Sequence, residues 1–381
     1  MKNRGLLFIL LLGVVSLFAD ITYEGSRSIV GPYLSILGAS GAVVGIVVGF
    51  SEFVGSGFRI VSGLISDKTQ KYWTLTIVGY AINLLAVPLL ALAWNWKVAA
   101  LLIILERFGK AIRVPARDTM LSYATKDVGR GWGFGIHEAM DQIGAILGPL
   151  FISALLMFKY SYQISFAFLL IPAILALATL FIAQFTFPRP QEMEPRSFRL
   201  ETKGFTKTYW MYLLAVGLVG AGYVDFALIA YHLQKTAALS PVWIPILYSI
   251  AMAVDGLAAL IMGRLFDMKG ISALIGATII SALFAPCVFF GNFYFLLLGM
   301  ILWGIGMGSQ ESIMRAVIPY LVSSEKRGSA YGVLNFVFGA FWAVGSAIIG
   351  ISYDVSIPFL VAFSLLAQFA SIPFFFLVKI K

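Results

Sequence analysis

Long apolar stretches recur along almost the whole chain, and they constrain its fold more than any other feature. A helix that crosses a bilayer needs about 20 mostly apolar residues. A chain of 381 residues that is 60% hydrophobic has too little polar surface to cover a soluble core. We therefore predict an all-α membrane protein with twelve transmembrane helices, at residues 6–36, 41–65, 73–95, 98–121, 132–158, 162–187, 208–234, 242–265, 271–290, 293–318, 329–353 and 357–378.

The sequence also repeats itself. GLISDK at 63–68 resembles GRLFDM at 263–268, and each follows the second predicted helix of its half. GRGWGFG at 129–135 likewise matches KRGSAYG at 326–332, where the fifth helix of each half begins. These pairs predict two pseudo-symmetric six-helix bundles, joined by a polar linker. A duplicated bundle with a site between its halves is typical of transporters. The predicted boundaries are 1–187, 188–207 and 208–381.

Basic residues indicate the orientation of the helices, because cytoplasmic loops are enriched in Lys and Arg. With the N-terminus inside, the outer loops hold only Lys97, Lys159 and Lys235. We therefore predict a multi-pass protein of the cytoplasmic membrane with both termini in the cytoplasm. The net charge of +9 then reflects these flanking residues rather than nucleic-acid binding. The inner segments hold Lys2, Arg4, Lys68, Lys71, Lys126, Arg130, Arg189, Arg196, Arg199, Lys203, Lys207, Lys269, Lys326, Arg327, Lys379 and Lys381.

The fourth predicted helix carries an unusual run of charges, ERFGKAIRVPARDTM at 106–120. At about 100° per residue, its four cations fall on one face. Charged side chains are costly in lipid, so we expect Arg107 and Lys110, near mid-depth, to line a central cavity. We place Arg113, Arg117 and Asp118 at a cytoplasmic gate. The alternative is that the two outer arginines reach the inner interface as anchors.

Other charged residues lie inside the predicted spans and provide partners for these cations. Structural ion pairs that hold helices together are the alternative role for any one of them. On the fifth helix, His137 and Asp141 lie one turn apart, either as a titratable pair or as a structural hydrogen bond. The remaining predicted residues of the substrate and proton cavity are Asp20, Glu24, Arg27, Glu52, Arg59, Asp141, Asp225, Asp255, Glu311 and Arg315.

These features together resemble the major facilitator superfamily. Its loop motif after helix two, G-x-x-x-D-[RK]-x-G-[RK]-[RK], is partly matched twice, and its helix-five motif, G-x-x-x-G-P, is matched once. In the helix-four motif, Ala111 replaces the usual glycine after Arg107. The resemblance implies a cytoplasmic gate at the loop motifs. The matching residues are Gly63, Asp67, Lys68, Gly263 and Asp267 in the loops, and Gly144, Gly148 and Pro149 on helix five.

Two stretches, ERFGKAIRVPARD and GFGIHEAMDQIGAILGP, are also similar to a subgroup of predicted prokaryotic permeases with no named substrate. We therefore expect a secondary active transporter that works by alternating access. The helix-five motif favours proton-coupled efflux of a small organic molecule. Proton-coupled uptake and a transport-inactive membrane sensor are the alternatives. We expect a monomer without cofactors, and no enzyme, because the sequence offers no nucleophile–base or metal constellation.

Overall fold

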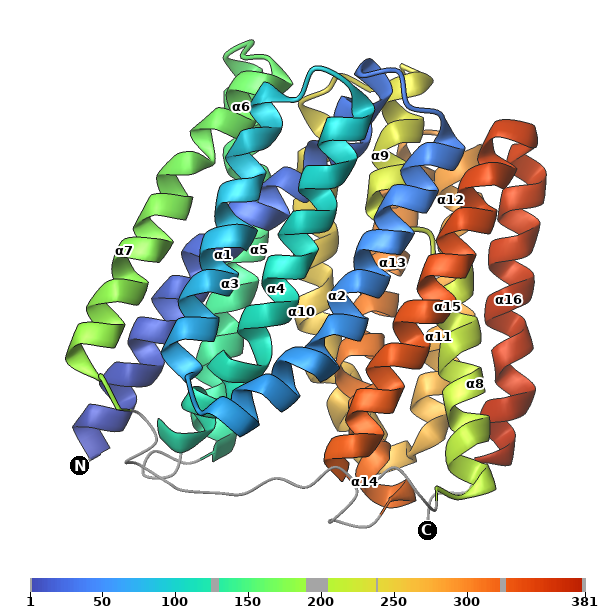
Figure 1. The fold of residues 1–381 in the computed structure, drawn as a ribbon. Coiled ribbons are helices and arrows are strands. Elements are labelled where there is room, and N and C mark those ends of the chain that lie inside the picture. Colours follow the sequence, from blue (N-terminus) through green and yellow to red (C-terminus); the bar gives the residue numbers. More distant parts are fainter. Residues whose placement is uncertain (1, 125–129, 190–204, 238, 323–326, 379–381) are drawn as a thin grey trace. The chain divides into compact units, whose positions relative to one another are not determined.

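The computed structural model describes every residue except 1, 125–129, 190–204, 238, 323–326 and 379–381. The described residues form helices almost throughout (Figure 1). These are α1 (Lys2–Ile36), α2 (Gly41–Thr69), α3 (Tyr72–Leu89), the 3-10 helix η1 (Leu90–Leu92), α4 (Trp96–Ala124), α5 (Arg130–Met157), α6 (Tyr162–Phe168), α7 (Leu170–Thr186), α8 (Lys207–Gly222), α9 (Phe226–Lys235), α10 (Trp243–Lys269), α11 (Ile271–Ala282), α12 (Phe284–Phe290), α13 (Phe293–Ala316), α14 (Ile318–Leu321), α15 (Arg327–Val355) and α16 (Ile357–Leu377).

The predicted all-α membrane fold is confirmed. Each predicted stretch corresponds to one long helix or to two shorter helices in sequence, such as α6 with α7 or α8 with α9. In the described part of the chain, eleven helical segments are long and apolar enough to cross a membrane. Helix α4 is not among them, because charged residues crowd its second half.

Contacts between Cα atoms divide the chain into two compact units. Unit 1 comprises 1–33, 54–198 and 240–249, and unit 2 comprises 34–53, 199–239 and 250–381. Boundaries between the units therefore fall inside α1, α2 and α10. The units differ from the predicted halves at residues 34–53 and 240–249. Most of the predicted linker lies outside the described residues. The division into two six-helix bundles stays a prediction.

Glycines allow helices of unit 1 to pack closely. A Cβ atom on Gly144 would lie 2.5 Å from the carbonyl oxygen of Leu17, and one on Gly148 would lie 2.7 Å from that of Ile21. Both distances are too short for a real contact, so only glycine lets α5 approach α1 this closely. This is the close approach that the helix-five motif predicts, and it sets the distance between the two helices at Asp20.

In unit 2, α8 packs against α15 and α16, and its buried tyrosines bond to neighbouring backbone. The Tyr209 hydroxyl donates to the carbonyl of Ala330 at 2.8 Å, and the Tyr212 hydroxyl donates to that of Met314 at 2.7 Å. Around them, leucine, isoleucine, valine and phenylalanine side chains form a continuous apolar core. Because both tyrosines are buried, each hydroxyl has to find its partner inside the protein.

Candidate functional site

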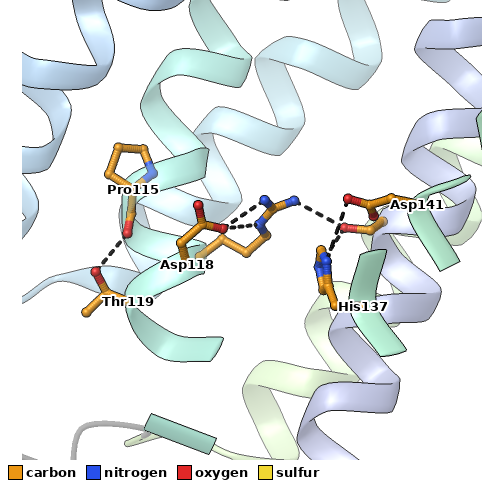
Figure 2. A network of polar contacts seen from close by, with 7 residues as sticks. Pro115, Asp118, Thr119, His137 and Asp141 are labelled. Atoms are coloured by element: carbon orange, nitrogen blue, oxygen red, sulfur yellow. Dashed lines mark hydrogen bonds and ion pairs between the residues drawn. The ribbon is translucent and has the colours of Figure 1, made fainter. Parts of the chain in front are cut away.

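A polar network in unit 1 connects three helices (Figure 2). On α4, the guanidinium of Arg117 donates to one carboxylate oxygen of Asp118 through Nε at 2.9 Å and Nη2 at 2.8 Å. Its Nη1 donates to the hydroxyl of Ser16 on α1 at 3.2 Å. That hydroxyl lies 3.0 Å from Nε2 of His137 on α5, whose Nδ1 is 3.6 Å from Asp141. An acid–base chain therefore runs from α4 through α1 to α5.

This network brings together residues that the sequence analysis placed in different groups. We assigned Arg117 and Asp118 to a cytoplasmic gate and Asp141 to the cavity, and the structure joins them through Ser16. The sequence gives no sign of Ser16, because serine is common in membrane helices and its role depends on which helices face each other. The His137–Asp141 pair is predicted by its i,i+4 spacing.

A second polar group in unit 1 surrounds Glu24, which is buried on α1. The hydroxyl of Tyr248, on α10, donates to one of its carboxylate oxygens at 2.6 Å. Arg27 lies 3.6 Å from the other oxygen, one turn along α1. A buried carboxylate needs hydrogen-bonding or oppositely charged partners of this kind, because an unpaired one is costly away from water. The spacing of Arg27 and Glu24 in the sequence predicts their proximity. Tyr248 is more than 200 positions away, so the sequence does not predict its contact with Glu24.

The third group lies around Arg107, which is 7% exposed. Its Nε is 3.4 Å from a carboxylate oxygen of the neighbouring Glu106. Asn83 of α3 donates both to the side chain of Glu106 at 2.7 Å and to its backbone carbonyl at 3.0 Å. We expected carboxylates of other helices as partners for Arg107, and we did not include Glu106 among the cavity residues. Its position beside Arg107 in the sequence was the signal that we missed.

Arg113 is deeply buried, with only 1% of its surface exposed. Its guanidinium carbon lies 4.1 Å from the centre of the Tyr80 ring, on α3. An interfacial anchor would reach toward water, so the anchor alternative is wrong for Arg113. Lys110 of the same face of α4 lies over the ring of Tyr23, with its Nζ 4.1 Å from the ring centre.

Asp20 is a buried carboxylate one turn before Tyr23 on α1. Four charged side chains of unit 1 act on it electrostatically, two acidic and two basic: Asp141, Glu24, Lys110 and Arg113. Charges of both signs therefore converge on the buried carboxylate of Asp20.

In unit 2, Asp225 lies where a membrane span is interrupted. Helix α8 ends at Gly222, and Asp225 then caps α9 by accepting a hydrogen bond from the backbone N–H of Ala227 at 2.9 Å. The free carbonyl of Gly222 accepts from the hydroxyl of Ser364 at 2.6 Å. Interrupted helices of this kind are common near transporter sites, because their open ends present polar backbone groups.

The other predicted cavity residues have varied surroundings. Asp255 is buried in unit 2, whereas Glu311 and Arg315 of α13 are exposed. Glu52 in unit 2 and Arg59 in unit 1 are half-buried on α2. That these five residues line one cavity stays a prediction.

The predicted cytoplasmic gate is described only in part. The side chain of Asp67 lies outside the described residues, and those of Lys68 and Asp267 are exposed. Gly63 and Gly263 have room for a side chain, since an added Cβ would meet nothing closer than 3.7 Å at the first and nothing within 4 Å at the second. Both glycines lie inside helices, α2 and α10, rather than in the predicted loops, and local packing does not require a glycine at either position. The gate stays a prediction.

Comparison with known proteins gives a consistent match along the chain. The model of the Major Facilitator Superfamily matches residues 11–346. An uncharacterized protein of Mycobacterium tuberculosis is 38% identical, over 98% of this chain and 93% of the relative. An uncharacterized transporter of the same superfamily in Methanocaldococcus jannaschii is 28% identical, over 91% and 88%. The multidrug resistance protein MdtH of Proteus mirabilis is 29% identical, over 35% of this chain and 34% of its own.

Among solved structures, the nucleoside transporter NupG superposes with a TM-score of 0.77. The match covers 97% of this chain and 98% of the transporter, with 16% sequence identity. At that identity the likeness concerns the fold, and the substrate of the other protein does not transfer.

Proposed function

Because the chain belongs to the major facilitator superfamily, we propose that it is a secondary active transporter that couples efflux of a small organic molecule to proton entry by alternating access. The observation that carries this proposal is the buried acid–base cluster of unit 1. Asp20, Glu24 and Glu106 are all at most 9% exposed inside apolar helices. Desolvated charges inside a membrane are expensive, and they mark proton and substrate paths far more often than scaffolds.

Efflux is favoured by two features. The first is the helix-five motif of Gly144, Gly148 and Pro149, whose resemblance to the superfamily's motif favours proton-coupled efflux. The partial similarity to a multidrug resistance protein also supports efflux, although it covers about a third of each chain. We propose the cytoplasmic side for both termini, from the loop charges.

A second candidate is proton-coupled uptake by symport. Two basic side chains, Lys110 and Arg113, act on the single carboxylate of Asp20. Protonation of that carboxylate would leave both cations available to an anion. Proton and anion would then favour each other's binding, which is the thermodynamic requirement of a symporter.

The test uses purified protein in proteoliposomes with the pH dye pyranine in the lumen and equal pH on both sides. Small organic compounds of positive, negative and no charge are added outside, and their uptake is followed by mass spectrometry. Antiport exports a proton for each molecule that enters, so the lumen becomes more alkaline. Symport makes it more acidic. Uptake without any proton movement would refute proton coupling, and a chain that moves none of these compounds would favour the sensor alternative.

A further inference from the structure

In the described chain, two cations on α4, Lys110 and Arg113, lack the carboxylate partners that three other cations of the unit 1 helices have. Arg27, Arg107 and Arg117 each lie within 3.6 Å of a carboxylate oxygen. Arg113 has no such partner among the described residues, and its Nε and Nη1 are buried without a hydrogen bond there. A buried guanidinium presents five donors in a planar fork, so two unused buried donors indicate a missing acceptor.

Lys110 extends the same face of α4, one turn before Arg113. Both cations lie against the ring of Tyr23 on α1, the Lys110 Nζ at 4.1 Å and the Arg113 Cζ at 5.8 Å from the ring centre. Arg113 is also covered by the ring of Tyr80. Ring faces attract cations but cannot accept the directed N–H bonds of a guanidinium as a carboxylate does. The rings therefore hold the two cations in place without neutralising them.

The carboxylate that could serve both cations is Asp20, one turn before Tyr23 on α1. It lies in electrostatic reach of each, yet neither cation forms an ion pair within 4.0 Å of it in the described chain. Glu24 also acts on Lys110 electrostatically, but no ion pair within 4.0 Å joins the two in the described chain. Buried charges are stable only when they are paired and hydrogen-bonded, and both cations lack a directly bonded anion in the described chain.

We propose that Lys110 and Arg113 bind an anionic group, a carboxylate or a phosphate, with the ring of Tyr23 beside it. The inference rests on the proposed transport function in taking that anion as part of the transported molecule, and it fits the symport candidate, in which proton and anion favour each other's binding. The guanidinium of Arg113 supplies a planar pair of donors, and the ammonium of Lys110 supplies a mobile point charge. Asp20 competes with the anion for both cations. Neutralising Asp20 therefore strengthens anion binding, whereas neutralising either cation weakens it.

The test measures binding to the purified full-length protein in detergent, from the shift of its thermal unfolding temperature. The probes are benzoate, benzamide and benzylammonium, which share a ring and differ in charge, and inorganic phosphate. We expect benzoate and phosphate to stabilise the wild type and the two other probes to have no effect. Benzoate affinity should fall about tenfold or more in Lys110→Gln and Arg113→Gln, as for the loss of one charged hydrogen-bond partner.

Asp20→Asn should bind benzoate several-fold more tightly, roughly the effect of one competing charge. A variant that is merely damaged would not gain affinity, so this result separates the proposal from a general structural defect. The matched control is Lys97→Gln, which removes an exposed lysine of the same helix and should leave affinity unchanged. If Arg113→Gln does not fold, the variants of Lys110 and Asp20 still decide the outcome.

Benzoate affinity that is unchanged in both Lys110→Gln and Asp20→Asn would overturn the proposal, as would equal stabilisation by benzamide. A further arm adds phosphatidylglycerol to the detergent. If this lipid stabilises the protein through Lys110 while benzoate and phosphate do not, the cluster holds a lipid headgroup and the inference of a soluble anionic substrate is wrong. Binding is measured without transport, so anion binding without proton movement in vesicles would refute the proposed function alone.

Discussion

Gly144→Ala is the sharpest test of how α1 and α5 position the buried charges. The added Cβ would lie 2.5 Å from the carbonyl oxygen of Leu17 and 2.8 Å from the Cβ of Asp20. The closest ordinary contact of this kind is 3.4 Å, so one helix has to move by about 0.9 Å, which is 3.4 minus 2.5. Because the nearest atom belongs to the backbone, a side-chain rotation cannot relieve the clash. Overpacking of this kind typically costs about 1–3 kcal/mol.

The matched control is Gly135→Ala on the same helix, where an added Cβ meets nothing within 4 Å. Both substitutions gain about 1 kcal/mol of helix propensity, so this gain cancels in the comparison. We expect the free energy of unfolding of Gly144→Ala to lie about 1–3 kcal/mol below that of Gly135→Ala. Reversible unfolding in mixed micelles with increasing SDS measures the difference. Equal stability of the two variants would show that α1 and α5 are not in close contact, and would refute the packing argument.

Three further predictions follow from the polar contacts. Arg107→Ala should abolish transport and lower the free energy of unfolding by about 3–5 kcal/mol, because Glu106 loses its buried partner. Arg107→Lys should restore only part of the transport and part of the stability, and normal transport by Arg107→Ala would contradict this prediction. Ser16→Ala should lower the free energy of unfolding in SDS by about 1–3 kcal/mol, because Arg117 and His137 lose the hydroxyl that both contact. An unchanged unfolding midpoint would speak against the network. The carboxylate of Asp354 accepts hydrogen bonds from the first two backbone N–H groups of α2, at 3.0 and 2.8 Å. Asp354→Ala should therefore lower the free energy of unfolding by about 0.5–2 kcal/mol, which is measured as a lower unfolding temperature. A wild-type unfolding temperature would rule out this cap.

The membrane spans could be predicted from the sequence because the bilayer requires long apolar stretches whatever their neighbours are. The interruptions within spans could not. Asp225 appears in the sequence as a charge inside a continuous span, whereas in the structure it starts a new helix after a break. Such a break is tolerated because the carbonyl of Gly222 finds the hydroxyl of Ser364, 142 positions away. A distant partner of this kind leaves no local pattern in the sequence.

The cationic face of α4 could also be predicted, because helical periodicity depends only on spacing. Which cation has which partner could not be predicted. Arg107 pairs with its neighbour Glu106, while Arg113 lies against aromatic rings of two other helices. Those pairings depend on how closely α3 and α1 approach α4. Gly79 permits that approach for α3, since a Cβ there would lie 2.7 Å from the backbone nitrogen of Arg113.

The central claim is that buried carboxylates of the membrane helices exchange the protons that drive transport. The most direct measurement is the lumenal pH change per molecule transported, in pyranine-loaded proteoliposomes, for Asp20→Asn, Glu24→Gln and Glu52→Gln beside the wild type. We predict that at least one of these amides still moves the compound down its gradient but no longer moves protons, because an amide cannot exchange one. Wild-type proton movement by all three variants would contradict the account.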